Sequence, residues 1–266
     1  MRRPSNERRL TGPFATGFRM TISSMPETAT PATVLADVLL APLLAALLYL
    51  LISRDGQGHG ATLPAVVGAA SMQTVLLSGS ALLRDRLEGT LAHLALGPRI
   101  PVRLWAGRFA ALASVGFAGS AVTWAATCAL FHLGTGGAPD PVPPLMLLAA
   151  SLASCGLGAA VAACSLAARD ALFLVNLCGF AIPLLCGLVA PVSVLPVPLR
   201  WLAYALPTSW MTDAARAYAT GDAGSAWRRL VVGVMAGMAW LLVAMLVLKA
   251  AAVLARRDGT FDATAM

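Results

Sequence analysis

Long apolar runs alternate with short polar stretches along most of this chain, and six of the runs are almost free of charged residues. An apolar run of about 20 residues is typical of a transmembrane helix, since that length crosses the hydrocarbon core of a bilayer. Only helices and closed barrels satisfy every backbone polar group in lipid. The pattern therefore predicts an all-α integral membrane protein with six transmembrane helices. We expect the spans at about residues 34–52, 63–83, 109–131, 145–168, 171–190 and 230–255.

The most charged segment lies between the second and third apolar runs, at residues 84–108. Leu83, Leu87, Leu91 and Leu94 recur at helical spacing, so they form one apolar stripe. Arg84, Asp85, Arg86, Glu88, Thr90 and His93 occupy the other face. A glycine and Pro98 then end the helix. We expect an amphipathic helix that lies along the membrane surface and presents polar residues to water.

The stretch before the last run, residues 191–229, is too rich in proline for a simple span and too apolar for an ordinary loop. A pair of short re-entrant helices fits both observations. Residues 1–32 form a polar, basic arm, of which Phe14 to Met25 are expected on the bilayer surface. Residues 33–257 then form the membrane domain, and residues 258–266 form a short tail.

Charge gives the orientation of the spans. The chain is 58% hydrophobic and only 12% charged, with a net charge of +7, whereas soluble domains are about 25% charged. The arm, the amphipathic segment, the turn at residue 169 and the tail end carry all but five of the 19 lysines and arginines. The exceptions are Arg54, Arg200, Arg216, Arg228 and Arg229. Basic residues accumulate in cytoplasmic loops, so both termini and the amphipathic segment are predicted to be cytoplasmic. The basic balance is thus explained by orientation and predicts no nucleic-acid partner.

The residues of this chain indicate no energy source and no chemistry of its own. A nucleotide-binding P-loop needs a lysine, and the one lysine is Lys249, followed by alanine. His59, His93 and His132 fall in different loops without metal-ligand spacing. We therefore predict no catalytic residue, no metal site and no cofactor in this chain. Gln73 and Asn176 are the polar residues of the predicted spans that could face a substrate path, although hydrogen bonding between helices is their usual role.

Two stretches are similar to the membrane permease subunits of ABC type-2 exporters. The first is LLRDRLEGTLAHLALGPRIPVRLWAGR, residues 82–108, and the second is CGLVAPVSVLPVPLRWLAYALPTSWMTDAARA, residues 186–217. The resemblance implies an ATPase-coupling role for Arg84, Asp85, Arg86, Glu88, Gly89, Thr90, Leu91, Leu94 and Pro98. It implies an external gate that contains Pro191, Leu195, Pro196, Pro207, Thr208 and Arg216.

The same resemblance implies partners and a location. A separate ABC ATPase subunit would bind ATP and Mg²⁺, and a second permease chain, alike or different, would complete a dimer in the lipid of the plasma membrane. The pair would move a small molecule, lipid or glycan outward by alternating access, with no catalysis by this chain itself. Two alternatives stay open: a haem-export-type permease of cytochrome c maturation, and a membrane scaffold or assembly factor that transports nothing. The substrate is not indicated by the residues.

Overall fold

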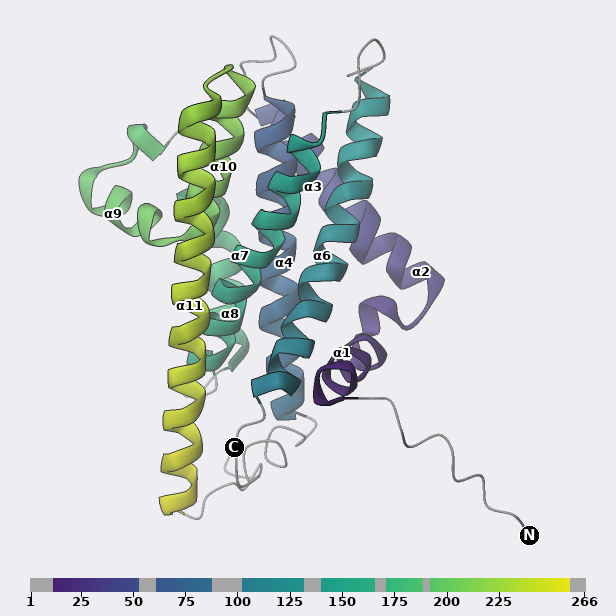
Figure 1. The fold of residues 1–266 in the computed structure, drawn as a ribbon, viewed down its shortest axis with the longest axis vertical. Helices are drawn as coiled ribbons and strands as arrows, with labels where there is room; N and C mark the ends of the chain where they lie inside the picture. The colour runs from purple at the N-terminus through teal and green to yellow at the C-terminus, as the bar shows by residue number, and fades with distance from the viewer. Residues whose placement is uncertain are drawn as a thin grey trace.

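The described part of the chain is an upright bundle of long helices (Figure 1), in agreement with the predicted all-α membrane class. The computed structural model describes residues 12–52, 61–87, 102–131, 140–165, 171–188 and 192–258. Five helical segments are long and apolar enough to cross a membrane, and Phe173–Leu185 is a shorter apolar helix. The long helices are α4 (Thr62–Leu87), α6 (Val102–Leu130), α7 (Val142–Ser165), α11 (Ala223–Asp258) and the composite first span described below.

The first span is one continuous helix with a π-helical middle. It consists of α2 (Pro31–Thr33), the π-helix η2 (Val34–Leu40) and α3 (Ala41–Ile52). Pro42 has no N–H and its ring crowds the carbonyl four residues earlier, that of Val38. That carbonyl lies against Gly119 of α6, where an added Cβ would be 2.5 Å from the oxygen. In the π-helical register, where the Ala41 N–H bonds to the Ala36 carbonyl, Pro42 leaves the Asp37 carbonyl without a donor. Gln73 of α4 donates to that carbonyl at 2.8 Å, as membrane helices require.

The fifth predicted span is a shorter helix in the structure. α8 (Ala171–Leu185) ends five residues before the end of the predicted span. Its 15 residues rise only about 22 Å, less than the hydrocarbon core of roughly 30 Å. A 3₁₀ turn, η3 (Val192–Val194), and α9 (Val197–Ala205) follow and project sideways from the bundle in Figure 1. α10 (Pro207–Ala219) then continues to the end of the bundle where α11 begins.

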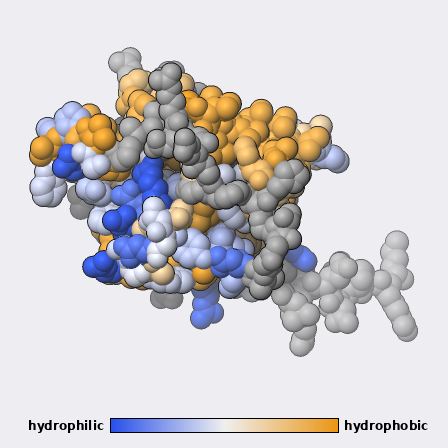
Figure 2. Space-filling model, turned by 90° about the horizontal axis from the view of Figure 1, so that it is seen from above, coloured by the Kyte–Doolittle hydropathy of each residue, from blue (hydrophilic) through white to orange (hydrophobic). Residues whose placement is uncertain are grey.

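The helix bundle has an α1 end and an α10 end. The α1 end holds α1 (Pro13–Ser24), the 3₁₀ turn η1 (Pro26–Thr28), the last turn of α4 and the first turns of α6. The α10 end holds the turn between α10 and α11. Figure 2 shows that hydrophilic residues occupy part of the α10 end beside a broad hydrophobic band. α11 returns to the same end of the bundle as α1. The last helix begins at Ala223 rather than at residue 230.

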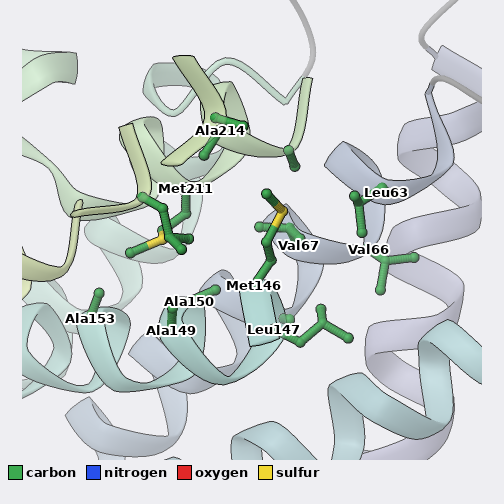
Figure 3. Packing of buried hydrophobic residues seen from close by; sticks show 14 of the residues in the cluster. Leu63, Val66, Val67, Met146, Leu147, Ala149, Ala150, Ala153, Met211 and Ala214 are labelled. Atoms are coloured by element: carbon green, nitrogen blue, oxygen red, sulfur yellow. The ribbon is translucent and has the colours of Figure 1, made fainter. Parts of the chain in front are cut away.

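Small residues allow the central helices to approach closely. α4 and α7 form the centre, and 17 residues of α7 are buried. Gly158 of α7 meets the carbonyl of Val75, and Gly237 of α11 meets Ala153. Figure 3 shows side chains of α4, α7 and α10 interdigitating in one buried cluster around Met146 and Met211. Gly158 and Gly237 thus allow α7 to pack closely against α4 and α11 within one chain.

Candidate functional site

At the α1 end, α1 crosses the start of α6 with no side chain between the two backbones. A Cβ added at Gly17 would overlap the carbonyl oxygen of Leu104, and one added at Gly107 would overlap that of Phe14. Each helix therefore contributes a glycine at the point where the other helix presents a carbonyl. This reciprocal contact fixes α1 across the first turns of the third span.

A buried arginine strengthens this crossing. Arg108 of α6 is only 3% exposed, and its Nε donates a hydrogen bond to the Thr21 hydroxyl of α1 at 3.3 Å. Its guanidinium carbon lies 5.0 Å from the ring centre of Trp105, which places the cation over an aromatic face. Buried cations need such partners because desolvation is costly. Arg108 thus joins α1 to α6 by a hydrogen bond, in addition to the glycine contacts.

Arg84 connects the same region to α4. Its Nη2 lies 3.3 Å from Oε1 of Glu27 in η1, and its Nη1 donates to the Ser24 carbonyl at the end of α1. A cation is favoured at a helix C-terminus, where carbonyls lack partners. Both side chains of the ion pair are partly shielded from water. The end of α1 is therefore joined to the last turn of α4 as well as to α6.

The predicted coupling residues lie at this junction or beyond it. Arg84, Asp85 and Arg86 continue α4 and do not begin a separate helix, because the second span extends without a break to Leu87. Glu88, Gly89, Thr90, Leu91, Leu94 and Pro98 lie outside the described residues. The coupling role of all nine residues stays a prediction. The described residues on either side of segment 88–101, at the end of α4 and the start of α6, both contact α1.

Toward the α10 end, side chains of α10 donate hydrogen bonds to the carbonyls that follow the end of α8. Thr212 Oγ1 donates to the Cys186 carbonyl at 2.6 Å. Arg216 donates through Nη2 to the Gly187 carbonyl and pairs through Nη1 with Asp213 at 3.1 Å. Gly187 has a φ of 78°, the left-handed conformation in which glycine commonly ends helices. A broken helix is tolerated in a membrane when protein groups cap its ends.

α9 is held at both of its ends by side chains. At its start, Arg200 Nη2 donates to the carbonyls of Ser193 and Leu195, at 2.6 and 3.2 Å. At its end, the indole N–H of Trp210 donates to the Tyr204 carbonyl at 2.8 Å. Trp240 of α11 donates to the carbonyl of Ala205 at 2.7 Å. These contacts tie the sideways excursion of the chain to α10 and α11.

The predicted gate residues are distributed over this excursion. Pro196 precedes α9 and is exposed, Leu195 is half-buried, and Pro207 and Thr208 are buried at the start of α10. Arg216 caps α8, as described above. Pro191 lies outside the described residues. The structure thus contains the predicted pair of short helices, and a role in gating stays a prediction.

The two polar residues of the predicted path have different surroundings. Gln73 Nε2 donates to the Asp37 carbonyl in η2 at 2.8 Å, which is the hydrogen bond between helices expected of such a residue. Asn176 lies on the exposed side of α8, away from the core clusters. These two residues are therefore not brought together within one chain.

Sequence reasoning missed most of the junction at the α1 end. Gly17, Thr21 and Glu27 belong to the stretch interpreted as a surface arm, and Gly107 and Arg108 end the charged segment 84–108 without a predicted role of their own. Pro13 at the first position of a helix and the glycines at matching places were available signals. Sequence alone does not show which glycine of one helix meets which other helix, because many glycines of this chain could make such a contact.

The comparisons agree with this architecture. The sequence model of the ABC-2 type transporter family matches residues 14–219, which extend from α1 to the end of α10. The chain therefore belongs to the ABC-2 type transporter family, and it is a permease subunit of an ABC transporter. Domains of this kind are transport components of the membrane and are not catalytic by themselves. A comparison with curated proteins gives no match.

Proposed function

We propose that this chain is the permease subunit of an ATP-driven exporter of the plasma membrane, with both termini cytoplasmic. A separate ABC ATPase binds ATP and Mg²⁺ and contacts segment 84–98. A second permease chain completes the transport path, and a small molecule, lipid or glycan moves outward. The observation that carries the proposal is the junction at the α1 end, where Arg84 joins the beginning of that segment to α1.

The junction supports a mechanical route for coupling. Segment 88–101 begins after α4 and ends at α6, and α1 is fixed to both helices by Arg84, Arg108 and the Gly17–Gly107 crossing. A push on the segment therefore acts on spans two and three together. Through η1 and α2 it also reaches the first span. To convert a 1:99 mixture of two states to 99:1, ATP must favour one state by about 5.5 kcal/mol. Rigid, buried contacts transmit such a bias better than an untethered loop.

The gate is proposed at the opposite end. The carbonyls of Cys186 and Gly187 are held by Thr212 and Arg216, so α8 and α10 move as one crossing while these bonds persist. Alternating access requires the α9 excursion to shift against α11, where Trp240 holds it. The outward-facing state is expected to have lost one or more of these side-chain caps.

Charge reversal tests the coupling role. Arg86→Glu and Glu88→Arg should each reduce co-purification with the ATPase or reduce ATPase stimulation by transported compounds. Arg228→Glu is the matched control, because Arg228 is exposed at the α10 end of the bundle and distant from the junction. Normal assembly and normal transport in both reversed variants would rule out the proposed contact with the ATPase.

A further inference from the structure

Asp37 is an acidic residue on the exposed side of the first span, where the surface is otherwise apolar. The other exposed residues from Leu35 to Ile52 are alanines, leucines and the isoleucine itself. Asp37 is also the one aspartate or glutamate within the five described helices that are long enough to cross a membrane and the shorter helix Phe173–Leu185. A carboxylate within a span is costly to place there, and such residues usually have a function.

Asp37 lies near the middle of the bundle, although it is close to the start of its own helix. Its carbonyl accepts a hydrogen bond from Gln73, which is about 16 Å and about 12 Å from the two ends of the span Thr62–Ala81. The next residue of the first span contacts Gly119, about 24 Å and about 16 Å from the ends of the span Arg103–Leu130. Figure 1 shows the first span beginning at α2, partway along the bundle. The carboxylate is therefore at the depth of hydrocarbon.

The backbone around Asp37 is held in an unusual conformation. Asp37 is the middle residue of the π-helix η2, Val34–Leu40. π-Helical turns are rare and frequently occur at functional sites. The bond from Gln73 holds the Asp37 carbonyl, whereas the carboxylate makes no hydrogen bond and no ion pair with the residues that the structure describes. The carboxylate is thus fixed in position and accessible to a ligand.

The cations of this chain lie at other depths. In the described spans, lysine and arginine occur only near the ends, at Arg103, Arg108, Arg228, Arg229 and Lys249. A second copy of the chain would bring the same residues at the same depths. A carboxylate away from water requires a counter-charge, so a ligand has to supply it. The exposed leucines beside Asp37 offer apolar surface to the rest of that ligand.

We propose that Asp37 is the substrate-binding carboxylate of this transporter, and that the substrate class is an amphiphilic organic cation. The positive charge of the substrate pairs with the carboxylate, and its apolar body lies against Leu40 and Leu44. This inference rests on the proposed function, because it identifies the class of compound that the exporter would move. It favours a small cationic molecule over a glycan or an anionic lipid.

Binding of a lipophilic cation tests the proposal on the permease purified with its partner ATPase in phosphatidylcholine nanodiscs. Tetraphenylphosphonium is the probe, and tetraphenylborate, which has the same shape and the opposite charge, is its control. The phosphonium should bind saturably and stimulate ATP hydrolysis, and the borate should do neither. Asp37→Asn keeps the size of the side chain and removes its charge. It should raise the dissociation constant for the phosphonium by about tenfold or more, as loss of a close charge pair does.

Two further variants separate the charge from general effects on the fold. Asp37→Glu keeps the charge and should retain most of the affinity for the phosphonium. Asp222→Asn removes an exposed acid at the start of α11, where asparagine caps a helix as well as aspartate does, and should leave the affinity unchanged. If Asp37→Asn fails to assemble with the ATPase, the comparison of the two probes on the native complex still tests the proposal.

The outcomes distinguish the binding site from the exporter. Equal phosphonium affinity in the native and Asp37→Asn complexes would overturn the proposal, as would equal binding of the borate or the absence of saturable phosphonium binding. ATP-driven uptake of the phosphonium into inverted membrane vesicles tests the proposed function separately. Binding that depends on Asp37 without such uptake would retain the site and contradict the exporter. Uptake that is equal in the native and Asp37→Asn proteins would retain the exporter and overturn the site.

Discussion

Arg84 and Glu27 form an ion pair at 3.3 Å although 57 positions separate them in the chain. The pair joins the turn after α1 to the last turn of the second span. It also lies immediately before segment 88–101, in which most of the predicted coupling residues fall. The region interpreted from sequence as a basic arm is thus joined to the end of α4, from which segment 88–101 continues.

Exchanging the charges of Arg84 and Glu27 tests whether the ion pair itself, rather than either charge alone, stabilises the junction. Arg84→Glu or Glu27→Arg alone places like charges side by side, and should lower both the stability of the complex and its substrate-stimulated ATPase activity. The double variant restores the pair and should recover most of both. The loss in stability is expected to be about 1 kcal/mol, because the side chains are only partly shielded from water. Thermal unfolding of the purified complex and ATPase assays measure the two effects; a double variant no better than either single variant would contradict this prediction.

The glycine crossing between α1 and α6 gives a prediction with a control in the same segment. Gly17→Ala places a Cβ against the Leu104 carbonyl, and Gly107→Ala places one against that of Phe14. Neither backbone can move without separating the helices, so each variant should lose about 1–3 kcal/mol, the usual cost of overpacking. Gly12→Ala, with nothing within 4 Å of the new Cβ, should have no effect.

Limited proteolysis of the N-terminal region reports this crossing directly. Cleavage within residues 13–24 should be faster in the Gly17 and Gly107 variants than in the Gly12 variant. Equal cleavage rates in all three would show that the close approach of α1 to α6 does not hold α1 in place.

The caps at the end of α8 should contribute measurably to stability. Thr212→Val removes the donor to the Cys186 carbonyl, and leaving a buried acceptor without its partner costs about 1–3 kcal/mol. Thr220→Val is the matched control, because its hydroxyl bonds only to the Ala217 carbonyl of its own helix. Arg216→Ala should cost more than Thr212→Val, since it also deprives Asp213 of its partner. Thermal unfolding ranks the variants; Thr212→Val equal to Thr220→Val would mean that the cap is replaced by other groups.

Five of the six predicted spans correspond to helices long and apolar enough to cross a membrane, because hydropathy detects long apolar runs whether they face lipid or other helices. It failed where a local conformation depends on a distant group. α8 ends at Leu185 rather than at residue 190, since Gly187 adopts a left-handed conformation that α10 stabilises through Arg216. The apolar run itself gave no such stop. Likewise, the exposed position of Asn176 follows from the rotation of α8 in the bundle, which hydropathy does not determine.

The π-helical turn in the first span leads to the last prediction. From sequence, Pro42 indicates a kink in the first span. The sequence does not indicate which neighbours would cover the carbonyls whose hydrogen bonds change in a π-helix. Gln73 donates to the Asp37 carbonyl, and Gly119 lies against that of Val38. Gln73→Leu keeps the size and removes the donor, so the Asp37 carbonyl loses this bond. The variant should lose about 0.6–1.7 kcal/mol, as single hydrogen bonds between membrane helices do. Ser80→Ala, whose hydroxyl bonds within its own helix to Leu77, should lose less. Thermal unfolding of both variants in the same detergent compares them, and equal stabilities would show that the first span does not depend on Gln73.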